Sequence, residues 1–159
     1  MTSATTTPLT VHLSGEIHSD WRERILAGAK EAGLQLRFTA PVTDHATSDD
    51  CGAELLGDES EAFWRDAKGA GINAIRSRTM LAAADVVVVR FGDRYKQWNA
   101  AFEAGWAAAL GKPLIVLHDK ELTHALKEVD AAAQAVASTP EQVVGILRYV
   151  QRGELLRSQ

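Results

Sequence analysis

The stretch from Asp85 to Gly92, DVVVVRFG, restricts the fold of this chain more than any other feature. Its four consecutive valines are β-branched, which favours a strand, and they leave no polar side chain for a solvent-exposed face. A strand buried on both faces is typical of the centre of a parallel sheet that helices cover on either side. The sequence therefore predicts an α/β fold built around this strand.

Strand and helix patterns alternate about five times along the chain, as in a parallel sheet with helices on both faces. We expect the other strands at 9–15, 34–41, 113–118 and 134–138. Helices are expected at 19–33, 60–84, 99–111, 121–133 and 139–153, the second of them interrupted around Gly69 and Gly71. Five strands in a chain of 159 residues predict a flavodoxin-like (Rossmann-like) three-layer sandwich with a five-stranded parallel sheet in the order 2-1-3-4-5.

Composition and charge argue against several classes of protein. The formal net charge is −4, from 21 acidic and 17 basic side chains, which disfavours a role in binding nucleic acid phosphates. No apolar run approaches the roughly 20 residues that cross a membrane, the start lacks signal-peptide features, and the single Cys51 suits a reducing compartment. We therefore expect a cytoplasmic protein without nucleic acid or membrane partners. Residues 9–153 would form its domain, between a disordered lead at 1–8 and a tail at 154–159.

Long polar segments follow the carboxyl ends of the first four predicted strands, where ligands bind in sheets of this kind. Four of the five histidines lie in or just beyond these segments: His18, His45, His118 and His124. The stretch 42–60 is expected to be a loop of about 20 residues, a length that is uncommon in a compact domain without a function. Within it, Asp44, His45 and Asp49 are open to two interpretations, a metal site or a turn held by Asx-type hydrogen bonds.

A carboxylate stands in an unusual place in the alanine-rich helix that follows the valine strand. Asn99 and Glu103 are four residues apart, so they share one helix face near the end that points to the binding edge. We expect a separate stripe to be the core face of this helix; it consists of Trp98, Phe102, Trp106 and Ala109. Glu103 is then either a first-turn carboxylate favoured by the helix dipole or a partly enclosed functional group.

The segment around this carboxylate, FEAGWAAALGKPLIVL, resembles the C-terminal signature of the nucleoside 2-deoxyribosyltransferases. The pattern ExGxAxxxxKP is matched residue by residue by Glu103, Gly105, Ala107, Lys112 and Pro113. The turn SGEIH, which contains Gly15 and Glu16, resembles the glycine turn of that superfamily, where the chain passes beside the sugar. Four further stretches, IHSDWRE, TDHATSDD, GINAIRSRTMLAAADVVVV and FGDRYKQWNAAFEA, resemble the YtoQ family of the same superfamily, and this resemblance covers about residues 9–150.

The resemblance implies a function for Glu103. In the transferases the matching glutamate is the nucleophile that attacks the anomeric carbon of a nucleoside, and a glycosyl ester forms. A second base or water then takes the sugar. We therefore expect cleavage or transfer at the N-glycosidic bond of a nucleoside or nucleoside 5′-monophosphate, with no cofactor and no metal. The resemblance also implies a homodimer or a larger homo-oligomer.

The chain departs from the transferase pattern at two positions. Ser77 and Gln97 stand where the transferases have aspartates, so the proton for the leaving base must come from elsewhere. Asp93 is our catalytic candidate beside Glu103, with Asp44, Asp49 and His18 as alternatives. The candidate substrate-binding residues are Gly15, Glu16, His18, Asp44, His45, Tyr95, Gln97 and Asn99. Arg94 and Lys96 are either a phosphate site or solvated loop charges.

Two other functions remain open at this point. A non-catalytic nucleotide-binding or sensing module would keep the pocket without the missing acids. A metal-assisted hydrolase would instead use Asp44, His45 and Asp49.

Overall fold

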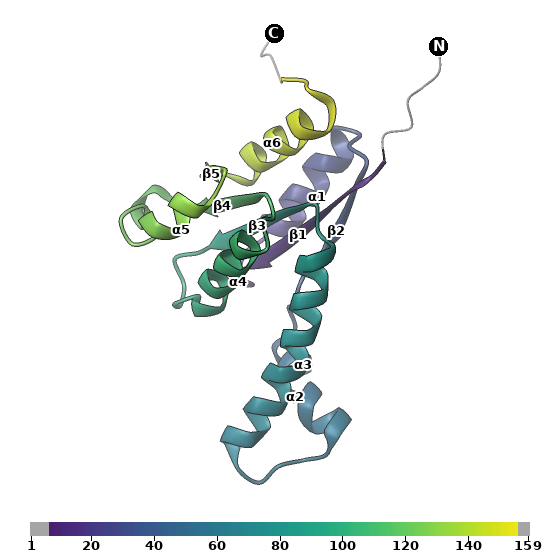
Figure 1. Ribbon diagram of the computed structural model, residues 1–159, viewed down its shortest axis with the longest axis vertical. Helices are drawn as coiled ribbons and strands as arrows, with labels where there is room; N and C mark the ends of the chain where they lie inside the picture. Colours follow the sequence, from purple (N-terminus) through teal and green to yellow (C-terminus); the bar gives the residue numbers. More distant parts are fainter. Residues whose placement is uncertain (1–6, 156–159) are drawn as a thin grey trace. The chain divides into compact units, whose positions relative to one another are not determined.

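The computed structural model describes residues 7–155, which form two compact units (Figure 1). The first unit consists of the described residues up to Thr39 and from Ala84 onward, and the second spans Ala40–Ala83. Residues 1–6 of the predicted lead and residues 156–159 of the predicted tail lie outside the described residues. The domain boundaries at 9 and 153 stay a prediction.

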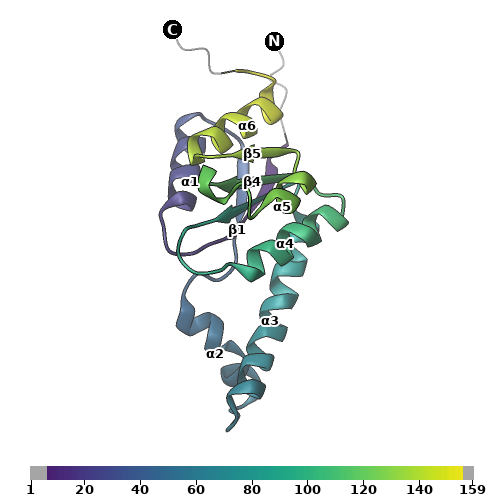
Figure 2. The same cartoon turned by 90° about the vertical axis from the view of Figure 1, so that its left-hand side faces the viewer.

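The first unit is a five-stranded parallel sheet in the order β2-β1-β3-β4-β5, which confirms the predicted fold class. Its strands are β1 (Leu9–Gly15), β2 (Leu36–Thr39), β3 (Val86–Phe91), β4 (Leu114–His118) and β5 (Ala135–Ala137). Its helices are α1 (Trp21–Glu31), α4 (Trp98–Ala109), α5 (Lys127–Ala132), α6 (Pro140–Arg152) and the short 3₁₀ helix η1 (Lys120–Leu122). Helices α1 and α6 cover one face of the sheet, and α4 and α5 cover the other (Figures 1 and 2).

The valine strand lies at the centre, as predicted. β3 pairs with β1 on one side and with β4 on the other, and all four valines are buried. Val86 and Val88 belong to the core that α1 and α6 complete with Trp21, Ile25 and Leu147. Because side chains alternate along a strand, Val87 and Val89 face the opposite layer, which contains α4.

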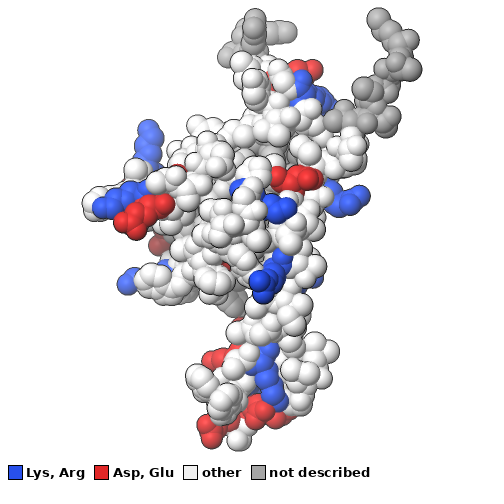
Figure 3. Space-filling view, in the orientation of Figure 1, with Lys and Arg blue, Asp and Glu red and all other residues white. Residues whose placement is uncertain are grey.

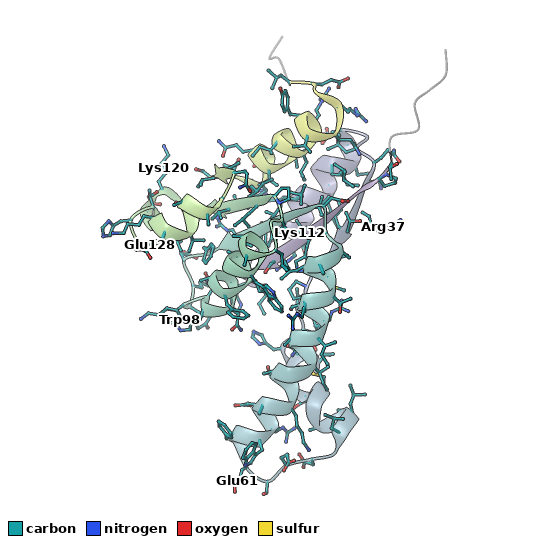
Figure 4. The ribbon with its side chains drawn as sticks, viewed as in Figure 1. Arg37, Glu61, Trp98, Lys112, Lys120 and Glu128 are labelled. Carbon is teal, nitrogen blue, oxygen red and sulfur yellow. The ribbon has the colours of Figure 1, made fainter. Side chains whose placement is uncertain are left out.

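Helix α4 packs against the sheet through its alanines, so the predicted core face of this helix is wrong. Ala100, Ala104 and Ala107 are buried, whereas Trp98 is 72% exposed and Phe102 is 68% exposed. Small side chains allow the helix backbone to approach β1, β3 and β4 closely, and the aromatic stripe is left on the other side. Figure 4 shows Trp98 at the start of α4, projecting away from the sheet.

The second unit is a pair of helices, α2 (His45–Leu56) and α3 (Ala62–Ala83). Most of the loop expected at 42–60 is therefore helix α2, and α3 runs through the interruption predicted at Gly69 and Gly71. The glycines permit close packing, because a Cβ on Gly52 would lie 2.4 Å from the backbone nitrogen of Gly69. Sequence periodicity missed α2 because its buried contact is made by glycine and not by a stripe of large apolar side chains.

Asp44 explains where α2 begins. Its Oδ2 accepts hydrogen bonds from the backbone N–H of Thr47, at 2.8 Å, and from the Thr47 hydroxyl, at 2.6 Å. These two donors lower the pKa of Asp44 below its usual value. The residue is an N-cap, which agrees with the interpretation of this stretch as an Asx-type turn.

The second unit carries acidic side chains around the connection between its two helices, near Glu61 (Figures 3 and 4). Several large apolar side chains of this unit are also exposed: Leu55, Leu56, Phe63, Trp64 and Ile75. Of the helices within residues 7–155, none combines the length and apolar character needed to cross a membrane.

Candidate functional site

Glu103 is half-buried in α4, and its carboxylate is held by the first strand. The hydroxyl of Ser14, a fully buried residue near the end of β1, donates a hydrogen bond to Oε2 of Glu103. Ser14 also pairs with Val89 of β3 in the sheet register, so β3 fixes the backbone that carries its hydroxyl. The carboxylate is thereby oriented at the carboxyl edge of the two central strands.

Gly15 brings the chain unusually close to β3. Its φ is +111°, and a Cβ added there would lie 2.1 Å from the carbonyl oxygen of Arg90. The next residue, Glu16, donates its backbone N–H to that same oxygen at 3.0 Å. Only glycine combines this dihedral angle with so close an approach, so Gly15 sets the path of the turn that follows β1.

Arg22 fixes the same turn from the other side. Its guanidinium is buried and donates to three backbone carbonyls, those of Leu13 (3.1 Å), Gly15 (3.0 Å) and Glu16 (2.8 Å). Burial lowers the pKa of Arg22 below its usual value, and the nearby carboxylates, Glu103 among them, oppose that shift. The end of β1 therefore carries an enclosed positive charge that acts on Glu103.

The carboxylate of Glu16 accepts hydrogen bonds from the turn to which Glu16 itself belongs. Oε2 accepts hydrogen bonds from the backbone N–H groups of His18, at 2.6 Å, and Ser19, at 3.2 Å, and Oε1 accepts one from the Ser19 hydroxyl. The residue is only 5% exposed. Gly92 makes room for it, since a Cβ at that position would lie 3.0 Å from Cγ of Glu16.

Gln97 closes the loop between β3 and α4. Its Oε1 accepts the backbone N–H of Gly92 at 3.0 Å, while its Nε2 donates to the carbonyls of Arg94 and Tyr95. Within this closed loop Tyr95 adopts a φ of +60°, and its exposed ring lies beside the His18 ring, with 5.0 Å between centroids. Both ends of the Gln97 amide therefore hold the loop, and its role in binding substrate stays a prediction.

The whole chain was compared with known proteins. A family described as nucleoside 2-deoxyribosyltransferase YtoQ matches residues 12–151. The chain belongs to this YtoQ family. One relative, "Uncharacterized protein YtoQ" of Bacillus subtilis (strain 168), is 40% identical over 140 residues, which covers 88% of this chain and 95% of the relative.

Solved structures support the fold. A 2-deoxyribosyltransferase from Bacillus psychrosaccharolyticus covers 85% of this chain and 90% of its own, with a TM-score of 0.51 and 15% identity. A conserved protein from Enterococcus faecalis V583 covers 91% of this chain and 99% of its own, with a TM-score of 0.58 and 14% identity. At such low identity these similarities concern the arrangement of strands and helices only.

Two of the signature positions that carried the family resemblance have structural roles in this YtoQ family member. Ala107 is fully buried in the contact between α4 and the sheet. Nζ of Lys112 donates to the carbonyl of Ala84 at 2.9 Å, which ties the end of α4 to the start of the valine strand (Figure 4). Glu103 is thus the signature position whose functional group lies at the carboxyl edge of the sheet.

The other predicted site residues fall into three places. Gly15, Glu16 and His18 form the turn after β1, and Asp93, Tyr95 and Gln97 lie in the loop after β3, where Asp93 is exposed. Asn99 is exposed in the first turn of α4. Asp44 and His45 belong to the start of α2, in the second unit.

Sequence reasoning missed Ser14 and Arg22. A serine at the end of a strand and an arginine in a first helical turn resemble ordinary surface residues, and neither belongs to the matched signature. Their roles emerge only from the approach of α4 and α1 to the end of β1.

One histidine expected at the binding edge has a structural role instead. His118 is buried, with Nε2 lying 3.0 Å from both carboxylate oxygens of Asp130, so it anchors α5 to the end of β4. Across residues 7–155, no three side chains of His, Cys, Asp or Glu come together as metal ligands.

Proposed function

We propose that this protein cleaves or transfers at the N-glycosidic bond of a nucleoside or nucleoside 5′-monophosphate, with Glu103 as the nucleophile. The observation that supports it best is the hydrogen bond from buried Ser14 to the Glu103 carboxylate. A carboxylate held at the carboxyl edge of the central strands has the chemistry and the orientation that a nucleophile requires. Membership of the YtoQ family, through the matched residues 12–151, is consistent with this role.

The proposed reaction has two steps. In the first, a carboxylate oxygen of Glu103 attacks C1′ of the sugar, the C1′–N bond breaks, and its electron pair leaves with the base, which takes up a proton. In the second, a nitrogen of another base, or water, attacks C1′ of the glycosyl ester and loses a proton, and the Glu103 carboxylate is released. Two inversions at C1′ retain the configuration, as in retaining glycosidases.

The residues around Glu103 suit the two steps. The Ser14 hydroxyl fixes Oε2, which leaves Oε1 to approach C1′. The enclosed charge of Arg22 stabilises the carboxylate when it departs in the second step. We assign the paired rings of Tyr95 and His18 to stacking on the base, and Asn99 to hydrogen bonding with the base edge or a sugar hydroxyl.

The proton for the leaving base has to come from a group that lies within hydrogen-bond reach of the base. Asp93 is exposed in the loop that carries Tyr95, so we propose it as the donor. His18, whose ring lies against Tyr95, is the alternative.

We further propose that the protein acts in the cytoplasm without a cofactor, as a homodimer or larger homo-oligomer. The exposed aromatic residues of α4, Trp98 and Phe102, support self-association, because large apolar side chains that lie together on a surface commonly belong to an interface.

The function is tested by incubating the protein with purine and pyrimidine nucleosides, ribo and 2′-deoxy, and with their 5′-monophosphates, followed by chromatography of the free base. We expect base release from at least one 2′-deoxy substrate, and a new nucleoside when a second base is added. Binding of substrates without base release from any of them would instead support a sensing module and would exclude the catalytic proposal.

Replacing Ser14 with alanine should slow base release without weakening substrate binding. The change removes one hydrogen bond to a charged group, an interaction of about 1.5–3 kcal/mol, so kcat should fall roughly 10- to 100-fold with little change in KM. Steady-state kinetics measure the effect, and the thermal unfolding midpoint shows whether the variant keeps its fold. An unchanged kcat in a folded variant would contradict a positioning role for this hydroxyl.

A further inference from the structure

The turn between β1 and α1 forms a small site for a negative charge, and the chain fills it with its own carboxylate. Two consecutive backbone N–H groups in a turn, with a hydroxyl beside them, are an arrangement that binds phosphate and other anions. Here the N–H groups of His18 and Ser19 and the hydroxyl of Ser19 all point at the Glu16 carboxylate.

The surrounding structure holds Glu16 in this position. The backbone of Glu16 is fixed at both ends, because its N–H donates to Arg90 and its carbonyl accepts from Trp21 Nε1 at 2.9 Å and from Arg22 at 2.8 Å. Gly92, just after β3, lies against this side chain, and a Cβ there would make a tight contact of 3.0 Å with Cγ of Glu16. Glu16 is therefore a fixed internal anion and not a surface carboxylate that happens to lie nearby.

The filled site lies beside the proposed nucleophile. Glu16 follows Ser14 by two residues, and the Ser14 hydroxyl contacts Glu103. Both carboxylates act electrostatically on the same buried guanidinium, that of Arg22. We therefore expect a sugar whose C1′ meets Glu103 to lie beside this turn, where the charge of Glu16 acts on it.

We propose that Glu16 is a specificity-determining residue that excludes phosphorylated substrates, so that the protein acts on nucleosides with a free 5′-hydroxyl. This inference rests on the proposed function and resolves the choice that it left between nucleosides and 5′-monophosphates. The N–H donors of this turn, which could otherwise bind a substrate phosphate, are already bonded to the Glu16 carboxylate. A phosphate near the turn is therefore repelled by that carboxylate. Repulsion between like charges at about 4 Å in a partly enclosed site corresponds to roughly 100-fold or more in kcat/KM.

The test compares a 2′-deoxynucleoside with its 5′-monophosphate on the full-length protein and on Glu16→Gln, which keeps the size of the side chain and removes its charge. The unaltered protein should favour the nucleoside by about 100-fold or more in kcat/KM, and Glu16→Gln should reduce that ratio at least tenfold. Glu31→Gln is the matched control, because it removes the same charge from an exposed position on α1 and should leave the ratio unchanged. A 5′-monophosphate cleaved by the unaltered protein as well as the nucleoside, or a ratio that Glu16→Gln does not alter, would overturn the proposal.

A second measurement does not depend on catalysis. Inorganic phosphate is titrated into the protein and into Glu16→Ala, and binding is followed by calorimetry. Removal of the carboxylate opens the three donors, so phosphate should bind Glu16→Ala at millimolar concentration and should not bind the unaltered protein. If no protein releases base from any substrate, the proposed function fails. This titration then decides the role of Glu16 by itself, because phosphate bound by the unaltered protein would refute it.

Discussion

Replacing Glu103 with glutamine should reduce base release by at least about 10³-fold, because an amide oxygen is a poor nucleophile towards C1′ and does not form a stable ester. The side chain keeps its size, and its amide oxygen still accepts the hydrogen bond from Ser14, so the fold of the variant should be unchanged. Chromatographic rates of base release measure the effect directly.

Two further results separate a nucleophile from a residue that only binds substrate. When a 2′-deoxynucleoside is added without an acceptor base, the intact mass of the unaltered protein should increase by one deoxyribosyl group, and that of Glu103→Gln should not. Glu128→Gln, which alters an exposed carboxylate on α5, should release base at the normal rate. Equal rates of base release from Glu103→Gln and the unaltered protein would remove Glu103 from the reaction.

Replacing Gly15 with alanine should lower the free energy of unfolding by more than about 4 kcal/mol, or prevent folding altogether. The added Cβ would lie 2.1 Å from the carbonyl oxygen of Arg90, and that carbonyl cannot move without breaking the pairing of β1 with β3. The positive φ adds a smaller cost of its own.

Gly111→Ala is the matched control for this effect. Gly111 has a φ of +67°, but a Cβ there would contact nothing within 4 Å, so only the cost of the left-handed conformation, about 1–2 kcal/mol, should appear. Urea unfolding of both variants measures the difference. Equal losses of stability would show that the close approach at Gly15 relaxes without cost.

Much of the fold was predictable because it depends on patterns that are local in the sequence. The valine run indicated a central strand, and the helix expected at 139–153 is α6, where the Thr139 hydroxyl accepts the N–H of Gln142 at 3.2 Å. Helix α2 was not predictable in the same way. Its N-cap and its glycine contact with α3 resemble a polar loop until the partner helix is known.

The orientation of α4 could not be predicted from the sequence either. Trp98, Phe102 and Trp106 have the spacing of a core face, and hydrophobic periodicity alone selects them. In the structure the alanine face packs against the sheet, because small side chains fit the short distance between the helix and the strands. Periodicity identifies the faces of a helix, but it does not state how close the neighbouring layer lies.

By itself, the sequence determined the parallel sheet and its strand order, the family, and the choice of Glu103 as the residue to examine. Each of these depends on short patterns that can be recognised one at a time along the chain. Only the tertiary structure decided that the Ser14 hydroxyl binds the Glu103 carboxylate and that the positive charge of Arg22 is buried beside the end of β1. It also decided that the side chains of Glu16 and Gln97 form hydrogen bonds within their own turns. The Ser14–Glu103 hydrogen bond joins residues that are 89 positions apart, so it exists only once the fold has brought β1 and α4 together. The contacts of Arg22, Glu16 and Gln97 are local in the sequence, but they depend on the path of each turn, and hydrophobic periodicity says nothing about that path.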